Sequence, residues 1–337
     1  MEAIMQTSPR RINPGRKGFT LKTSLILLTA SLALGVVLPS VLTSMLILSL
    51  LTQAVISGIL ATSVGLLIRQ NGVVSFGHAA FYGLGGYVMA LLAQRGIISI
   101  ELAILLGIVL PTVMALLLGL VIVRIPGVAF SMLTLAIGQA VHEVAIKARP
   151  LTGGDEGMTF TLPERIFGLP STMYQNADTM FIVCWTTLTL VLFGLYWLIR
   201  SPFGQLVDAI RENEERARFI GYRTVLPRAI ILAVSAAVAA IAGVLFTLYN
   251  TFLSPEMLHW GLSGSALVMA IIGGPKVVWG PAFGAIVFFL VKDMAGNVSE
   301  HWPIIIGATL IFVTLMLPMG IGGALQRLFI GSGKQEA

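Results

Sequence analysis

The sequence has few charged residues and only one cysteine. Charged residues make up 11% of its 337 positions, whereas an ordinary soluble domain carries about 25%. Hydrophobic residues make up 56%, which is more apolar surface than a soluble fold could bury. The single cysteine, Cys184, stands in an apolar run, which excludes an intrachain disulfide framework or a thiolate metal cluster. Composition therefore predicts an all-α integral membrane protein.

The chain also lacks the motifs that carry catalysis. No G-x-x-x-x-G-K-[ST] loop is present, because the terminal GSGKQ lacks the first glycine and the hydroxyl residue. We therefore expect no ATP or other cofactor in this chain. No zinc-ligand spacing and no nucleophile elbow occur, so neither a metal site nor an enzymatic activity is predicted. The net charge of +6 fits basic cytoplasmic loops of a membrane protein rather than a nucleic-acid site.

Intervals without Asp, Glu, Lys or Arg predict the membrane spans, because a charge in the bilayer core costs several kcal/mol. The longest, 23–68, could hold two helices broken near Pro39. The others fit one helix each: 70–94, 102–123, 125–142, 179–199, 229–255, 257–275, 277–291 and 301–326. We predict about ten transmembrane helices, with broken or re-entrant segments among them.

Basic residues set the predicted orientation. If the basic tail at 1–22 is cytoplasmic, all but five of the 21 basic residues fall on the cytoplasmic side, as the positive-inside rule requires. The exceptions are Arg95, Lys147, Arg149, Arg165 and Lys292. We thus predict a transmembrane domain at 23–326 and a C-terminal tail at 327–337, with both termini cytoplasmic. The first apolar stretch also resembles a signal peptide with a cleavage option after Ala33, and we favour an uncleaved helix.

The segment SFGHAAFYGLGGY, residues 75–87, is dense in glycine and alanine. It predicts either a tight helix crossing without a ligand or a broken helix that lines a translocation pathway. Both interpretations place it at the centre of the bundle. An ionisable residue inside a membrane is a functional candidate, although a neutral histidine bonded to a carbonyl is the plainer interpretation of position 78. The candidates for the pathway are Ser75, Gly77, His78, Gly83, Gly85 and Gly86.

Two polar loops stand out from the apolar background. The sequence TGGDEG at 152–157 predicts a tight turn, either merely solvated or a docking or gating element on the periplasmic face. Its candidate residues are Thr152, Gly153, Gly154 and Asp155. The loop at 200–228 is the most polar stretch, and Ser201 with Pro202 predicts the start of an amphipathic cytoplasmic helix that ends at Gly221. A partner protein could bind this helix at the membrane surface.

These segments, together with RIPGVAFSMLTLAIGQ at 124–139, resemble the permease subunits of branched-chain amino acid ABC importers. The resemblance covers residues 50–325, and the family also includes urea, amide and aromatic-acid permeases. It implies a transporter in the bacterial inner membrane, surrounded by lipid, that imports branched-chain amino acids. The implied partners are a second homologous permease subunit, two ATP-binding cassette subunits that bind the ATP, and a periplasmic substrate-binding protein.

The resemblance also implies where the ATPase binds. Permeases of ABC systems carry a cytoplasmic motif approximated by Glu-Ala-Ala, three residues and Gly, which Glu215, Ala217 and Gly221 match. Arg216 replaces the middle alanine.

Two other classes stay open. An ion-coupled secondary transporter would show ionisable residues in mid-span, whereas only His78 and Glu143 lie near hydrocarbon. A membrane-embedded receptor or structural subunit would have no helix for docking an ATPase.

Overall fold

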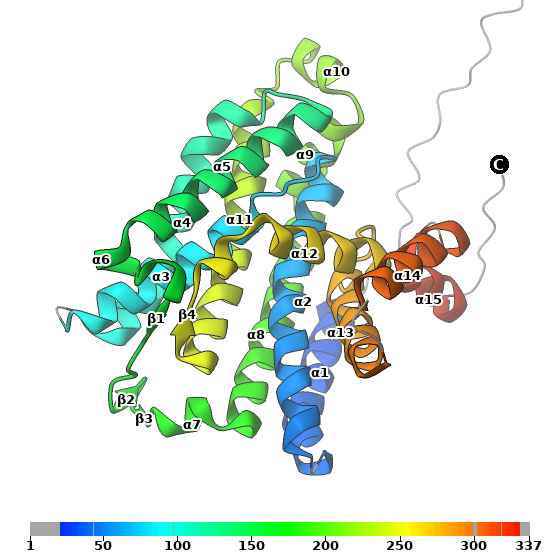
Figure 1. Ribbon diagram of the computed structural model, residues 1–337. Helices are drawn as coiled ribbons and strands as arrows, with labels where there is room; N and C mark the ends of the chain where they lie inside the picture. Colours follow the sequence, from blue (N-terminus) through cyan, green and yellow to red (C-terminus); the bar gives the residue numbers. More distant parts are fainter. Residues whose placement is uncertain (1–20, 43, 97, 299–301, 318, 331–337) are drawn as a thin grey trace, which may run out of the picture.

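The computed structural model describes residues 21–42, 44–96, 98–298, 302–317 and 319–330, and helices dominate it (Figure 1). The long helices of the first half are α1 (Leu21–Val41), α2 (Met45–Asn71), α3 (His78–Gln94), α4 (Ile100–Ile122) and α5 (Gly127–Lys147). Those of the second half are α8 (Ala177–Arg200), α11 (Val225–Asn250), α12 (Trp260–Gly273), α13 (Gly280–Val298), α14 (Trp302–Met316) and α15 (Gly320–Ile330). The predicted all-α fold is thus confirmed.

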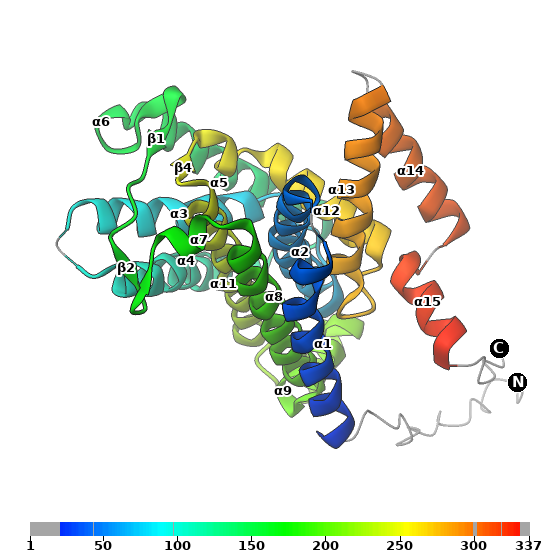
Figure 2. The same cartoon turned by 90° about the horizontal axis from the view of Figure 1, so that it is seen from below.

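Helices α2, α3, α4 and α11 form the core of the bundle. Helix α11 packs against the other three, and most of its residues are buried. Helices α8, α12 and α13 pack against α2. Figure 2 shows α1 on the outer side of the bundle beside α8, and α14 with α15 beyond α13. Core helices that are apolar on every side are what a bundle inside a membrane requires, because their neighbours are other helices and lipid.

Six helices within the described residues are long and apolar enough to cross a membrane. They are Met45–Asn71, Ile100–Ile122, Gly127–Lys147, Ala177–Arg200, Val225–Asn250 and Pro303–Leu325, and the last of these runs through α14 and α15. Shorter apolar helices are Leu25–Val41 and Trp260–Gly273. The protein is therefore a multi-pass membrane protein. The number of ten crossings stays a prediction, because several charge-free intervals contain short helices.

Two of the short helices, α3 and α12, follow long ones in the same way. Helix α2 ends at Asn71, followed by Gly72 with a φ of 68°. Helix α11 ends at Asn250, followed by Thr251 with a φ of 52°. In both cases the chain then leaves the helical conformation before the short helix begins. Both short helices carry Val-Met-Ala, at 88–90 and 268–270.

The two helix pairs run in opposite directions through the bundle. The end of α2 contacts α9 (Pro202–Glu212), whereas α11 begins near α9 and α10 (Glu214–Phe219) and runs away from them. Units of this kind, in inverted orientation and with interrupted helices, are typical of transporter folds.

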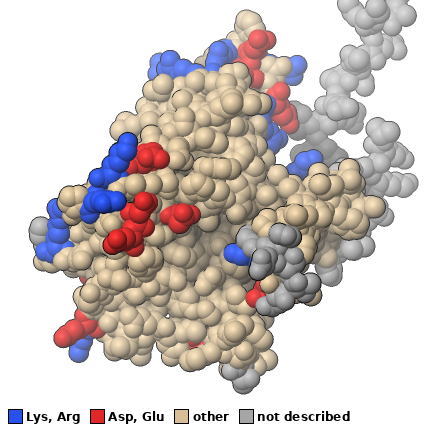
Figure 3. Space-filling view, in the orientation of Figure 1, with Lys and Arg blue, Asp and Glu red and all other residues tan. Residues whose placement is uncertain are grey.

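One end of the bundle collects basic residues, and we call it the α9–α10 end. There Arg69 Nη1 donates to the carbonyl oxygen of Lys276 at 2.6 Å, and the guanidinium of Arg211 donates to the carbonyl oxygen of Arg69. Arg228 lies in the first turn of α11, where its carbonyl oxygen accepts from Asn71 Nδ2. Figure 3 shows Lys and Arg together with Asp and Glu at this end, over α10, and a second mixed group of charges over α6 (Arg149–Thr152). The tail at residues 1–20 and residues 331–337 lie outside the described residues, so the location of both termini stays a prediction.

The opposite end carries the loop between α5 and α8. It contains α6, the 3-10 helix η1 (Gly154–Glu156), the strands β1 (Met158–Thr159), β2 (Arg165–Ile166) and β3 (Leu169–Pro170), and α7 (Thr172–Gln175). Strand β1 pairs antiparallel with β4 (Phe252–Leu253), which follows α11 and precedes the 3-10 helix η2 (Pro255–Leu258). Since α11 has 26 residues and a helix rises 1.5 Å per residue, about 39 Å separates this loop from α10.

Candidate functional site

Helix α3 is preceded by a non-helical segment that runs through the interior. Residues 72–77 are not helical, and such backbone needs hydrogen-bond partners wherever water is absent. Helix α5 supplies two of them, since the hydroxyl of Ser131 donates to the Val74 carbonyl oxygen at 2.7 Å and the Phe76 N–H donates to Thr134 Oγ1 at 3.3 Å. The hydroxyl of Ser75 accepts from Gly77 N at 3.2 Å. A non-helical segment therefore separates α2 from α3, and whether it lines a translocation pathway stays a prediction.

His78 lies at the start of α3 and is fully buried. Its Nε2 lies 2.7 Å from Ser235 Oγ, and that hydroxyl donates to the Ser63 carbonyl oxygen at 2.7 Å. Because the hydroxyl hydrogen of Ser235 is directed to the Ser63 carbonyl oxygen, His78 Nε2 is the donor in its bond to Ser235 Oγ. Through Ser235, this histidine is linked to the carbonyl oxygen of Ser63 on α2.

The first turn of α3 meets the first turn of α12 close to this histidine. The free N–H of Ala79 donates to Ser263 Oγ at 2.8 Å. A hydroxyl from one short helix thus satisfies an N–H group that the other helix leaves without an intrahelical partner. Ser235, Ser63, His78 and Ser263 together connect α11, α2, α3 and α12 at the centre of the bundle.

The glycines of α3 lie against other helices with almost no space around them. A Cβ atom at position 85 would lie 2.6 Å from the carbonyl oxygen of Ala240 on α11. A Cβ at 83 would overlap Leu258, and one at 86 would overlap Thr247. These positions form a tight helix crossing, and whether the crossing also takes part in transport stays a prediction. A role of Ser75, Gly77 or these glycines in lining the pathway stays a prediction.

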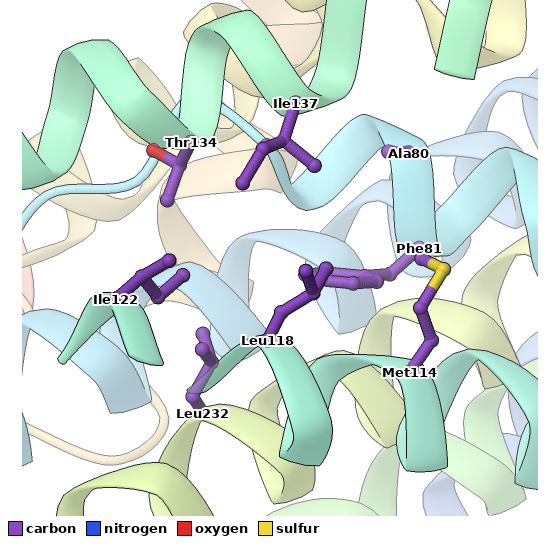
Figure 4. Close-up of a pocket in the computed structure, with 9 residues that line it drawn as sticks. Ala80, Phe81, Met114, Leu118, Ile122, Thr134, Ile137 and Leu232 are labelled. Carbon is purple, nitrogen blue, oxygen red and sulfur yellow. The ribbon is translucent and has the colours of Figure 1, made fainter. Parts of the chain in front are cut away.

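A narrow apolar cavity lies beside the start of α3, between α3, α4, α5 and α11 (Figure 4). Its lining includes Phe81, Met114, Leu118 and Ile137, and the hydroxyl of Thr134 is its polar group. That hydroxyl already donates to the Ser131 carbonyl oxygen. The cavity suits an apolar group and offers nothing to bind an ionised one, since a buried charge needs a partner.

The polar loop at 200–228 contains two helices and not the single one predicted. Helix α9 begins as expected, with Ser201 as its N-cap accepting from Gly204 N at 3.2 Å. The chain then breaks at Asn213, whose backbone is extended and whose Oδ1 caps α10 by accepting from Arg216 N at 2.8 Å. Asparagine is a strong N-cap, so it starts a new helix within the charge run. Gly221, with a φ of 97°, follows the end of α10.

The residues that match the family's cytoplasmic motif differ in accessibility. Glu215 is exposed, whereas Ala217 is buried and so is not available for a direct contact. Gly221 is exposed and supplies a left-handed conformation that other residues rarely adopt. The large apolar side chains of Phe219, Ile220 and Tyr222 are exposed beside it. We call these three side chains the apolar tip.

Glu214, and not Glu215, is the organised carboxylate of this loop. Its Oε1 accepts from Arg218 Nη2 at 2.5 Å and from Thr224 Oγ1 at 2.8 Å, and its Oε2 accepts from Arg228 Nη1 at 2.9 Å. Partial burial raises the pKa of Glu214, but the hydrogen bond from Thr224 and the charges of Arg228 and Arg218 outweigh it and hold that pKa below its usual value. A lowered folded-state pKa contributes stability above the unfolded value and loses it only as pH falls through the folded value. The cluster is therefore intact at neutral pH.

The turn at Thr152 to Asp155 is built around its glycines. Gly153 and Gly154 have φ values of 78° and 65°, which only glycine adopts at little cost. Thr152 is buried, and its hydroxyl donates to the Ala145 carbonyl oxygen at 2.5 Å, while Asp155 is exposed. The turn lies at the end opposite α10. Whether this end faces the periplasm stays a prediction.

Comparison with known families gives the context for this geometry. The family model described as branched-chain amino acid transport system / permease component matches residues 46–314. The chain belongs to this permease family.

Curated relatives of the permease include transport proteins of more than one system. It is 24% identical to the high-affinity branched-chain amino acid transport system permease protein LivM of Salmonella typhimurium, over 94% of this chain and 78% of that protein. The probable LivM of Methanocaldococcus jannaschii is 25% identical over 67% and 68%. The autoinducer 2 import system permease protein LsrC of Salmonella choleraesuis is 30% identical over 34% of each. These relatives are transport permeases and not enzymes. No solved structure matches the permease.

Several organised residues of the permease were missed by sequence reasoning. Ser235 and Ser263 lie in apolar runs where a serine carries no distinctive signal. Glu214 was passed over because the family motif drew attention to Glu215. Asn213 before two glutamates is an N-cap signal that could have revealed the second helix.

Proposed function

We propose that this chain is the permease subunit of an ATP-driven importer that carries branched-chain amino acids across the bacterial inner membrane. It works with a second homologous permease, two ATP-binding cassette subunits and a periplasmic substrate-binding protein. The observation that carries the proposal is the apolar tip on α10, which protrudes between two membrane spans of a chain that belongs to the permease family.

The apolar tip is suited to binding a cytoplasmic ATPase. Phe219 is 92% exposed and Ile220 is 69% exposed, and isolated apolar groups of this size at a protein tip gain free energy when a partner's groove covers them. Glu215 and Gly221 border the tip and remain proposed contacts. Ala217 is buried on the inner face of α10. ATP-driven movement of the partner then displaces α10 and the helices attached to it, which gives alternating access through rigid-body motion.

Residues at the two ends of the bundle give a test of orientation. In a Cys184→Ser background, a membrane-impermeant maleimide added to intact spheroplasts is expected to label Asp155→Cys and to leave Glu215→Cys unlabelled until the membrane is opened. Both side chains are exposed in the structure, so a failure to react reports the membrane and not burial. Labelling of Glu215→Cys from outside with Asp155→Cys protected would reverse the proposed topology.

The substrate proposal is tested in proteoliposomes that contain the whole complex. Uptake of radiolabelled leucine is expected to require ATP on the ATPase side together with the binding protein, and unlabelled isoleucine and valine should compete. A protonophore should leave uptake intact, because no ion gradient drives it. Competition by urea or an amide alone would mean that the substrate is urea or an amide and not a branched-chain amino acid. Uptake that follows an imposed ion gradient without ATP would establish the secondary-transporter alternative.

A further inference from the structure

The cluster around Glu214 joins the proposed docking helix to the core of the bundle. Glu214 belongs to α10, whereas Thr224 and Arg228 lie just before α11 and in its first turns. The side chain of Arg228 is 12% exposed and that of Glu214 is 32% exposed. An ion pair with this much burial is screened less than a surface pair, and three hydrogen bonds hold the carboxylate in place. The joint between α10 and α11 is therefore rigid compared with the exposed loop around it.

Arg228 continues this connection to the interruption before α3. Its backbone carbonyl oxygen accepts from Asn71 Nδ2 at 3.0 Å. Asn71 is the last residue of α2, and the extended segment that leads to His78 begins directly after it. One arginine thus bonds α10 through its side chain and the α2–α3 junction through its backbone.

We propose that Glu214 is a positioning residue that couples movement of α10 to α11 and to the α2–α3 junction through Arg228. The proposal rests on the proposed function, because it requires an ATPase that moves α10. Glu214 does not bind the ATPase itself, since its carboxylate is directed to groups of its own chain. It keeps α10 and α11 moving as one body, so that the force reaches the crossing of α3 with α12.

A contact that only stabilises the loop and a contact that couples α10 to α11 have different effects on transport when they are removed. If Glu214 only stabilised the loop, its removal would lower the amount of folded complex and leave the work done per ATP unchanged. If it couples α10 to α11, its removal lets the ATPase cycle while the core of the permease follows poorly. The ratio of substrate transported to ATP hydrolysed distinguishes these cases, because it is normalised to the complex that cycles.

The experiment uses the complete complex in proteoliposomes, with leucine as the probe substrate. The variants are Glu214→Gln, Glu214→Asp and the charge exchange Glu214→Arg with Arg228→Glu. Glu212→Gln is the matched control, because it removes an exposed carboxylate at the end of α9, two residues from Glu214. For each we measure the ATPase subunits retained on purification, the rate of ATP hydrolysis and the leucine imported per ATP.

Glu214→Gln is expected to retain the ATPase subunits and to lower leucine imported per ATP by about tenfold, since a hydrogen bond to a charged group contributes on that scale. Glu214→Asp and the charge exchange should recover part of that ratio, and Glu212→Gln should leave it unchanged. An unchanged ratio in Glu214→Gln overturns the inference. If Glu214→Gln does not assemble, the charge exchange decides, and restored assembly without any recovery of the ratio overturns it. Failure of the unmodified chain to bind any ATPase would instead overturn the proposed function.

Discussion

Gly85→Leu is expected to abolish transport and to lower the yield of folded protein sharply, whereas Gly194→Leu leaves both near normal. A Cβ at position 85 lies 2.6 Å from the carbonyl oxygen and 2.9 Å from the Cα atom of Ala240. Both are backbone atoms of a buried helix, so no side-chain rotation relieves the overlap. Gly194 on α8 has no atom within 4 Å of its Cβ position, and it is exposed.

Overpacking a well-packed interior costs about 1–3 kcal/mol even when neighbours adjust, and a backbone contact leaves less room for adjustment. Gly85→Ala should therefore already lower the thermal unfolding temperature in detergent, with Gly85→Leu lower still. Size-exclusion profiles, unfolding curves and uptake are measured on Gly85→Ala, Gly85→Leu and Gly194→Leu. Wild-type uptake by Gly85→Leu at wild-type yield would show that α3 does not lie against α11.

The helices could be predicted from the sequence because charge is excluded from hydrocarbon. The interval 102–123 covers α4 except for its first two residues, and the interval 229–255 covers α11 except for its first four. The same rule was less informative for 70–94 and 257–275, because absence of charge does not distinguish a full helix from an extended segment followed by a short one. Serine and threonine hydroxyls on neighbouring helices satisfy the extended backbone here, and those pairings arise only in the folded bundle.

The position of the polar residues at the centre of the bundle was predictable from the sequence, but their hydrogen-bond partners were not. Glycine-rich packing around position 85 follows from residue size, which the sequence displays directly. The hydrogen bond between His78 and Ser235 joins residues 157 apart in the chain, and no local sequence pattern predicts it. For Glu214, the decisive fact is that Thr224 and Arg228 lie within reach, which depends on the break at Asn213. A single continuous helix, as the sequence suggested, would have placed these groups differently.

The double change Phe219→Ser with Ile220→Ser is expected to prevent stable binding of the ATPase while leaving the permease folded. These side chains are 92% and 69% exposed, and exposed positions rarely affect folding by more than about 0.5 kcal/mol. Burying a large apolar side chain in a partner contributes about 1.5–3 kcal/mol, so losing two weakens binding by about two orders of magnitude or more. Loss of the apolar tip should therefore matter more than loss of the exposed Glu215 carboxylate.

The matched control removes comparable apolar groups from the other end of the molecule. Leu169→Ser with Met173→Ser changes side chains that are 47% and 42% exposed in the loop between α5 and α8, about 39 Å away along α11 by its helical rise. Binding is measured by titrating purified ATPase subunits onto the permease in nanodiscs, and function by ATP hydrolysis stimulated by substrate-loaded binding protein. The control pair should bind the ATPase as the unmodified chain does. The apolar tip lies outside the spans, and its residues make no contribution to the buried core. Equal ATPase affinity in the Phe219→Ser, Ile220→Ser protein would therefore mean that the ATPase binds elsewhere on the permease. In that case α10 would be a solvated helix without a docking role.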